Sequence, residues 1–409
     1  MVRATVTGML AHAYLVSGDV TPNTEQQVTS AVDAVRASGY RLVHFRCLTL
    51  LARLQMLQGR LREASATYEQ AGQATPEEVL QVLSASSVYC FALGDLLREW
   101  NRLDEAEQLL AQGMEQMSGK LSVYGDDVLL GYLAMVRLQQ ARGEYSRAVA
   151  TLDAFTHLAE MRHFPLHIRA LGDAMRAQIA LVQGKLTVAV CWADASGLSC
   201  IDAEISYPRE QEYLILARVR LAQGREDPAG PWLQQVQGLL ERLLREAEAK
   251  ARMRSALEIL VVQALTLDAQ GKRDEALSTL HEVLKRAEPE GYIRLFVDAG
   301  ASMQLLLQQI QARGVLPGYV ASLLSAFAGS HVIETVPADA ANQTLLEPLT
   351  RREREVLHLL SVGASNREIA RRLVLSLGTV KKHVTNLLGK LGAMNRTQAI
   401  VRAREYGLL

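Results

Sequence analysis

Hydrophobic and polar positions alternate in a repeating pattern along residues 1 to about 290. Leu- and Ala-rich segments of helical periodicity are separated by a turn residue, and an Ala follows that residue five places later. The pairs are Gly59 and Ala64, Asn101 and Ala106, Gly143 and Ala148, Gly184 and Ala189, Gly224 and Ala229, and Gly271 and Ala276. Successive turn residues stand 42, 42, 41, 40 and 47 positions apart. The pattern predicts a solenoid of helix pairs, in which each pair buries its apolar face on its neighbours.

The repeat pattern weakens at both ends of this region. Gly18 stands 41 residues before Gly59 but lacks the Ala, which predicts a degraded first unit. Between residues 329 and 348, polar residues and prolines such as Ser330, Pro337 and Pro348 interrupt short Ala and Val runs, as in a linker. The sequence therefore predicts a helical-repeat domain over 1–328, a linker over 329–348 and a further domain over 349–409.

Four short helical segments are predicted within residues 349–409, each with its own start signal. Thr350 and Ser365 open capping boxes with a Glu three residues on, and Ser376 and Asn395 supply further N-caps. Glycines stand where these helices would end: Gly363, Gly392 and Gly407.

The third of these segments has two distinct faces when its residues are advanced by about 100° each. One face is apolar and must be buried: Val380, Val384, Leu387, Leu388 and Leu391. The opposite face is basic and polar: Lys381, Lys382, Thr385, Asn386 and Gly389. Only Val374 and Leu375 join the second segment to Ser376, and two helices joined so closely, the second basic, indicate a helix-turn-helix that enters the major groove.

Charge also separates the C-terminal residues from the rest of the chain. Residues 348–409 contain 12 Lys and Arg against 4 Asp and Glu, whereas the whole chain contains 44 of each. The first 347 residues are therefore net acidic by 8 charges and the remainder is net basic by 8. A basic helical module at the end of an acidic body favours a polyanionic partner, most simply double-stranded DNA.

The C-terminal residues resemble the LuxR-type DNA-binding domain without a gap over about 60 residues. The matching positions are Leu349, Thr350, Glu353, Glu355–Leu357, Gly363, Ser365, Asn366, Glu368–Ala370, Leu373, Ser376, Thr379–Lys381, His383, Val384, Lys390–Gly392, Asn395, Arg396 and Ala399. The resemblance implies that residues 376–391 are the recognition helix and that the fourth helix forms a dimer contact on DNA, here with Ile400, Val401 and Arg404. Gly389 departs from the longer residue usual in the family, which removes one candidate contact.

The repeats resemble tetratricopeptide repeats, and more closely the helical-repeat region of MalT-like, large LuxR-family regulators. In that group the repeats end in a stretch similar to residues 287–298, followed by a Leu-rich segment. Those regulators usually begin with a P-loop domain, and this sequence contains no P-loop motif, so the chain is either a shortened relative or a fragment. The stacked helix pairs would make a long concave surface, larger than is needed to support a domain of about 60 residues, so we expect the repeats to receive an effector or protein partner.

We assign the candidate site residues by face. Lys381, Lys382 and Thr385 are expected to contact base edges, with Asn386 on the same face. Contacts with phosphates are expected from Thr379, His383, Ser365 and Asn366.

The sequence gives little support for a catalytic, metal-binding or membrane-spanning function. No catalytic set, cofactor motif, signal peptide or membrane-spanning run is present. The four cysteines show no paired spacing, which fits a reducing cytoplasm. Pro165 lies between His163 and His167, so these residues and His157 are interpreted as surface or inter-helix histidines rather than metal ligands. Asp126 and Asp127 are interpreted as a solvated loop or helix start rather than a catalytic pair.

Two functions remain open at this point. The first is an all-α transcriptional regulator that binds DNA through its C-terminal helix-turn-helix. The alternative is a helical-repeat scaffold or adaptor whose C-terminal domain binds DNA weakly or not at all.

Overall fold

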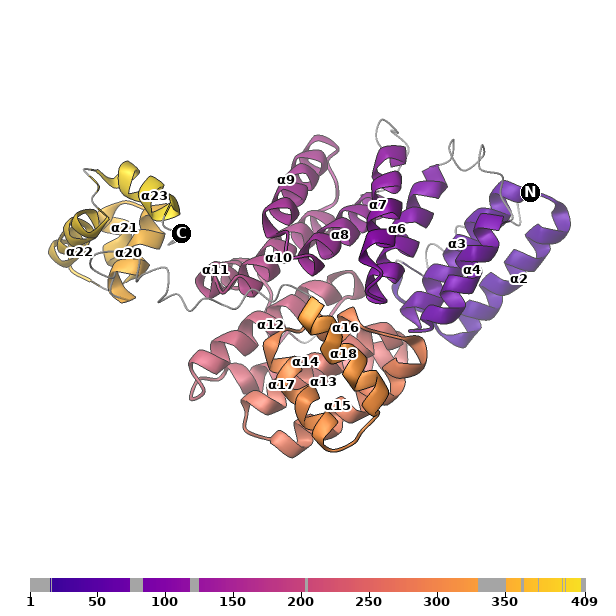
Figure 1. Cartoon of the computed structure of the whole chain (residues 1–409). Helices are drawn as coiled ribbons and strands as arrows, with labels where there is room; N and C mark the ends of the chain where they lie inside the picture. The colour runs from indigo at the N-terminus through magenta and orange to yellow at the C-terminus, as the bar shows by residue number, and fades with distance from the viewer. Residues whose placement is uncertain are drawn as a thin grey trace. The chain divides into compact units, whose positions relative to one another are not determined.

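The computed structural model describes residues 15, 17–73, 84–117, 125–202, 205–329, 351–361, 364–373, 375–391, 393 and 395–405. The chain divides into two compact units, Met1–Val332 and Ile333–Leu409 (Figure 1). Every regular element among the described residues is helical, which confirms the predicted all-α class. Gly329 is the last residue of a helix, and the rest of the predicted linker lies outside the described residues.

Helix pairs build most of the first unit, after a single helix α2 (Pro22–Ser38) that follows the Gly18 turn. The pairs are α3 (Arg41–Leu57) with α4 (Leu61–Gln73), α6 (Ser84–Glu99) with α7 (Leu103–Met117), α8 (Gly125–Ala141) with α9 (Tyr145–Met161), α10 (Leu166–Val182) with α11 (Leu186–Ala195), α12 (Glu210–Glu226) with α13 (Trp232–Ala249), and α14 (Met253–Ala269) with α15 (Arg273–Ala287). The short helices η1 (Tyr207–Arg209), η2 (Glu288–Glu290) and α16 (Arg294–Val297) and the longer α17 (Ala301–Ala312) and α18 (Pro317–Gly329) complete the unit.

Five of the predicted turns close in the same way. Their turn residues have left-handed backbones, with φ of 72–81° at Gly59, Gly143, Gly184 and Gly271 and 60° at Asn101. The next amide donates to the carbonyl oxygen five residues earlier, as Arg60 does to Gln55 at 2.9 Å, which is the Schellman closure of a helix. The Ala that follows each turn is fully buried, so the second helix approaches the first closely: Ala64, Ala106, Ala148, Ala189 and Ala276.

The prediction for the Gly224 and Ala229 pair is wrong. Gly224 lies inside α12, and a Cβ there would stand 2.5 Å from a Leu233 methyl group. Ala229 is exposed in the loop that joins α12 to α13. Gly224 therefore permits the close approach of Leu233, and the turn itself is formed by the following Asp-Pro-Ala-Gly-Pro segment, which also lengthens the interval to the next repeat.

The buried apolar residues described in the first unit form three clusters. The first helices of successive pairs pack in order, with α6 on α8, α8 on α10, α10 on α12 and α12 on α14. One cluster of buried residues extends from Ala52 in α3 to Phe327 in α18. None of the described helices is long and apolar enough to cross a membrane.

The structure refines the predictions for the polar residues of the middle repeats. Asp126 and Asp127 begin α8, but Asp127 is 9% exposed and pairs with Arg53 at 3.4 Å, so it is not simply solvated. The three histidines interpreted as surface residues are exposed: His157, His163 and His167. The described residues contain no group of three His, Cys, Asp or Glu that could hold a metal ion.

The second unit contains α20 (Arg351–Ser361), α21 (Asn366–Arg372), α22 (Leu377–Lys390) and α23 (Arg396–Glu405), one for each predicted segment. Its buried core draws on all four helices: Val356, Leu357, Leu360, Ala364, Ile369, Val380, Leu387, Leu391, Ala399 and Ala403. The predicted starts of three helices are confirmed. Ser365 and Glu368 form the complete capping box of α21, the Ser376 hydroxyl accepts from Thr379 N–H at 3.1 Å, and Asn395 accepts from Gln398 N–H at 2.9 Å. Thr350 and the three expected helix-ending glycines lie outside the described residues.

Candidate nucleic-acid interface

Helix α22 separates its apolar and basic residues onto opposite faces, as its sequence predicts. Val380, Leu387 and Leu391 are buried in the core of the second unit, and Val384 and Leu388 are half-buried against it. The residues of the opposite face are all exposed: Lys381, Lys382, Thr385, Asn386 and Gly389. Helix α22 contains no acidic residue, so the two lysines of this face give it a net positive charge.

The turn before α22 is fixed by backbone and side-chain hydrogen bonds. Leu375 N–H donates to the Ala370 carbonyl oxygen at 2.9 Å, which closes the end of α21. The guanidinium of Arg352 in α20 donates to the Leu373 carbonyl oxygen at 2.6 Å. Ser376 then caps α22, so α20 and α21 together set the angle at which the basic face is presented.

The four residues expected at phosphates are at the start of α21 and within α22. Ser365 and Thr379 are exposed, and Asn366 and His383 are half-buried. The Ser365 hydroxyl contacts a carboxylate oxygen of Glu368 at 2.7 Å and accepts from Glu368 N–H at 3.4 Å. The hydroxyls of Thr379 and Ser376 are 2.7 Å apart. The Ser365 hydroxyl thus caps α21, and the Thr379 hydroxyl is a partner of the Ser376 cap of α22.

A shallow hollow joins the start of α21 to α22. Ser365, Asn366 and Arg367 line one side, Leu377 and Lys381 line the other, and Leu360, Val384 and Arg396 complete it. The hollow therefore brings together residues of the two sets assigned from the sequence, Ser365 and Asn366 with Lys381.

The sequence interpretation missed several exposed residues of this surface. Arg367, Arg371 and Arg372 are exposed on α21, and Leu377 at the first position of α22 is 39% exposed. A helical projection of residues 366–372 places Arg367 and Arg371 opposite buried Ile369, so it would have found these two arginines, whereas Arg372 falls about 60° from Ile369. No sequence signal distinguishes Leu377 from a buried core leucine.

Other basic residues of the second unit are directed to its own backbone and carboxylates. Lys390 Nζ is 2.9 Å from the carboxylate of Glu353, whose side chain is 4% exposed. Arg396 donates to the Ala364 carbonyl oxygen at 3.1 Å, and Arg402 to that of Leu391 at 3.1 Å. The net positive charge of the C-terminal residues therefore includes cations that position helices as well as cations that face solvent.

The expected dimer contacts cannot be placed in the same way. Ile400, Val401 and Arg404 belong to α23, but their side chains lie outside the described residues. Ala399 and Ala403 of the same helix are buried in the core of the second unit.

Comparison with known proteins adds to this geometry. Residues 1–313 match the family described as the MalT-like TPR region, and residues 347–403 match the bacterial regulatory proteins of the luxR family. Similar curated proteins are named HTH-type transcriptional regulator MalT. That of Klebsiella pneumoniae is 27% identical, covering 88% of this chain and 41% of the relative. That of Cronobacter sakazakii is 25% identical, covering 99% and 45%, and that of Vibrio campbellii is 24% identical, covering 90% and 41%.

The chain thus spans less than half the length of these relatives. The match to the repeat family covers more than half of the chain itself. The two matches follow one another in the same order as the helix pairs and the C-terminal helices. The chain belongs to the family with the MalT-like TPR region, followed by a luxR-family helix-turn-helix domain.

Proposed function

We propose that this chain is a sequence-specific DNA-binding regulator of transcription that inserts α22 into the major groove. One observation carries the proposal: α22 presents two lysines, a threonine and an asparagine on an exposed face without acids, directly after a capped and braced turn. An α-helix with such a face fits the major groove, where its side chains reach base edges. The luxR-family match and the names of the curated relatives support the same function.

The residues divide into two groups by position. Lys381, Lys382 and Thr385 contact bases, and Asn386 extends the same face. Ser365, Asn366, Thr379 and His383 contact phosphates on either side, where the helix starts offer free amides. The exposed arginines of α21 add phosphate contacts: Arg367, Arg371 and Arg372.

Affinity measured across a salt series separates the two groups. Lys382→Ala and Lys381→Ala in the full chain should each weaken binding to a preferred duplex by about 5- to 150-fold, because a lost base contact costs about 1–3 kcal/mol, and should relax the sequence preference. Arg371→Ala should weaken binding to every duplex alike and reduce the salt slope by about one. Lys272→Ala, an exposed lysine of the repeats, is the matched control and should change neither quantity.

Unchanged affinity and preference in both α22 variants would contradict the base-contact assignment. Failure of the wild-type chain to bind any duplex above control levels at moderate salt would favour the scaffold or adaptor function instead.

We also propose that two copies bind DNA together through α23 and that the repeats receive an effector or protein partner. The support for both is the family match, since luxR-family domains commonly bind as dimers and the repeat region is far larger than a 60-residue DNA-binding domain needs as a support. Two-fold use of half-sites is also the common way in which a single recognition helix gains specificity.

A further inference from the structure

The segment that follows the last repeat lies across the turns of the first two described helix pairs. This segment, which we call the strap, comprises residues 288–298: η2, the turn at Gly291–Ile293, α16 and Asp298. In a simple solenoid each repeat contacts only its neighbours. Here the strap contacts residues about 190–230 positions earlier in the chain. The first and last parts of the repeat unit therefore meet, and α6, α14 and α16 lie close together in Figure 1.

The turn between α3 and α4 makes three hydrogen bonds with the strap. Arg62 donates through Nε to the Pro289 carbonyl oxygen at 2.5 Å, and its backbone amide donates to the Glu290 carboxylate at 3.0 Å. The Tyr292 hydroxyl donates to the Gly59 carbonyl oxygen at 3.3 Å. The left-handed turn at Gly59 thus provides both the closure of its own helix and an acceptor for the strap.

The turn between α6 and α7 makes a second set of contacts. Trp100 donates through its indole N–H to the Glu290 carbonyl oxygen at 2.9 Å. The Ile293 amide donates to the Glu99 carbonyl oxygen at 3.1 Å, and the Leu295 amide to the Glu99 carboxylate at 2.7 Å. Glu99 is thus the partner of two backbone amides of the strap.

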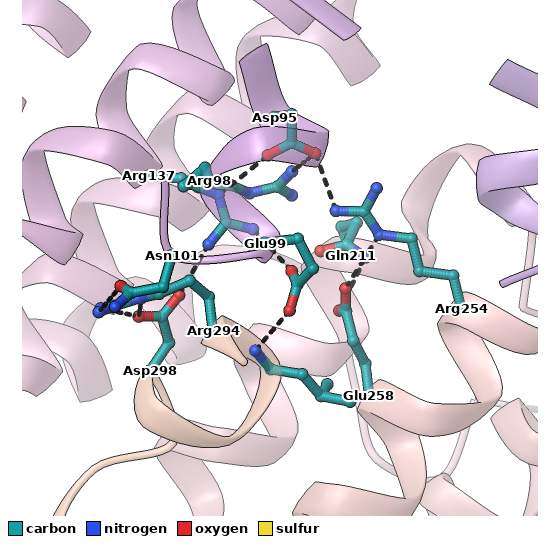
Figure 2. A network of polar contacts seen from close by, with 11 residues as sticks. Asp95, Arg98, Glu99, Asn101, Arg137, Gln211, Arg254, Glu258, Arg294 and Asp298 are labelled. Atoms are coloured by element: carbon teal, nitrogen blue, oxygen red, sulfur yellow. Dashed lines mark hydrogen bonds and ion pairs between the residues drawn. The ribbon is translucent and has the colours of Figure 1, made fainter. Parts of the chain in front are cut away.

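Charged side chains extend this joint into the interior of the unit (Figure 2). Arg98, whose side chain is 5% exposed, pairs with Asp298 of the strap at 3.0 Å and with Asp95 of its own helix at 3.0 Å. Arg294 of the strap pairs with Asp298 and donates to Asn101 at 3.3 Å. Arg254 of α14 pairs with Asp95 at 2.8 Å, so α14 is joined to α6 independently of the strap.

The residues before α2 join the late repeats at a separate place. The Gly18 carbonyl oxygen accepts from Arg252 Nη1 at 3.2 Å, and the Val20 amide donates to the Lys250 carbonyl oxygen at 3.3 Å. Arg252 is itself fixed by Glu210 at 2.8 Å and by the Tyr207 ring. These two hydrogen bonds join residues 18 and 20 to residues 252 and 250, so the early repeats contact the late ones here as well as at the strap.

We propose that the strap closes the repeat unit into a ring, and that it can be released from the turns after α3 and α6 while each helix pair stays folded. The reason is the chemistry of the joint. Tyr292, Phe296 and Val297 of the strap are buried. The contacts that the strap makes with the turns after α3 and α6 include hydrogen bonds and an ion pair, and water can satisfy these groups after release. The inference does not depend on DNA binding. It also gives a role to the stretch that marks the end of the repeats in the sequence.

Hydrogen exchange in the full chain tests the proposal. The variant Arg62→Ala/Trp100→Phe removes the side-chain hydrogen bonds that exposed Arg62 and half-buried Trp100 donate to the strap, and it keeps an aromatic ring at position 100. In this variant the amides of Ile293 and Leu295 should exchange at least about tenfold faster, because the strap that carries them is held less firmly against Glu99. Amides in the middle of α3, α6 and α14 should keep their wild-type rates. Helical circular dichroism should be unchanged.

Arg102→Ala is the matched control, since Arg102 is an exposed arginine at the same turn as Trp100 and pairs with Glu105 on its own helix. It should leave the Ile293 and Leu295 amides unchanged. Two results would overturn the proposal. One is wild-type exchange at these two amides in the double variant. The other is exchange in the middle of α3, α6 and α14 that is accelerated as much as exchange at Ile293 and Leu295, because the strap would then be released only when the whole unit unfolds.

Discussion

Replacing Lys390 with Met should destabilise the second unit strongly. Lys390 Nζ is 2.9 Å from the carboxylate of Glu353, and the two side chains are 17% and 4% exposed. The substitution leaves the Glu353 carboxylate buried without this cation. Breaking such a buried pair costs about 3–5 kcal/mol, and the partial exposure of Lys390 places the expected loss near the lower end, at about 3 kcal/mol. A domain of some 60 residues has a total stability of only roughly 3–9 kcal/mol, so the loss is a large part of it.

Calorimetry of the full chain measures this loss, because the two compact units are expected to unfold in separate transitions. A change of 1 kcal/mol shifts the melting temperature of so small a domain by about 4–8 °C. The transition of the second unit should therefore fall by about 12–24 °C in Lys390→Met, and the transition of the repeats should stay in place.

A matched control is available on the same helix as Glu353. Arg352 and Glu355 pair at 2.5 Å with side chains 36% and 33% exposed, so Glu355→Ala should cost no more than about 1 kcal/mol. The double variant Glu353→Met/Lys390→Met removes both charges and should recover most of the loss. A shift in Lys390→Met no larger than that of Glu355→Ala would refute the reasoning.

Two further predictions concern acid stability and dimerisation. Burial raises the pKa of Asp95, but Arg254, Arg98 and Arg137 outweigh it and lower that pKa below its usual range. The contribution of Asp95 is therefore present above its unfolded pKa and lost as pH falls below it. Below pH 3.8, protonation of Asp95 in the unfolded chain should lower the free energy of unfolding by about 1.4 kcal/mol per pH unit. Asp95→Asn lacks this contribution, so its free energy of unfolding, measured in urea, should fall less steeply with decreasing pH than that of wild type. Equal slopes of unfolding free energy against pH would contradict this. Val401→Glu should lower affinity for a duplex with two half-sites more than for one half-site, and equal losses would count against pairing through α23.

Short-range features were predictable from the sequence because they depend on neighbouring residues. Gly59 and Ala64 define a turn and a close helix contact within six residues, and the two faces of α22 follow from helical periodicity alone. The same pattern failed at Gly224, where glycine permits the approach of Leu233 instead of forming the turn. A glycine at the expected spacing does not distinguish these two roles.

Contacts between distant residues were not predictable in this way. The strap joins Arg62 to Glu290 across 228 positions, and no periodicity links them. Within the candidate interface, the basic face of α22 was predicted but the pairing of Lys390 with Glu353 was not, since it requires the packing of α20 on α22. Asp127 was interpreted as part of a solvated loop or a helix start, and the helix start is confirmed. Its pairing with Arg53 was not predictable for the same reason, because Arg53 lies two helix pairs earlier.

Selection of bound sites from a pool of random duplexes tests the central claim most directly. The wild-type chain should enrich a defined sequence, and Lys272→Ala should enrich the same one. The double variant Lys381→Ala/Lys382→Ala should lose that enrichment while still binding duplexes weakly through phosphate contacts. Recovery of the same sequence by the double variant, or of no preferred sequence by the wild-type chain, would contradict recognition of DNA by α22.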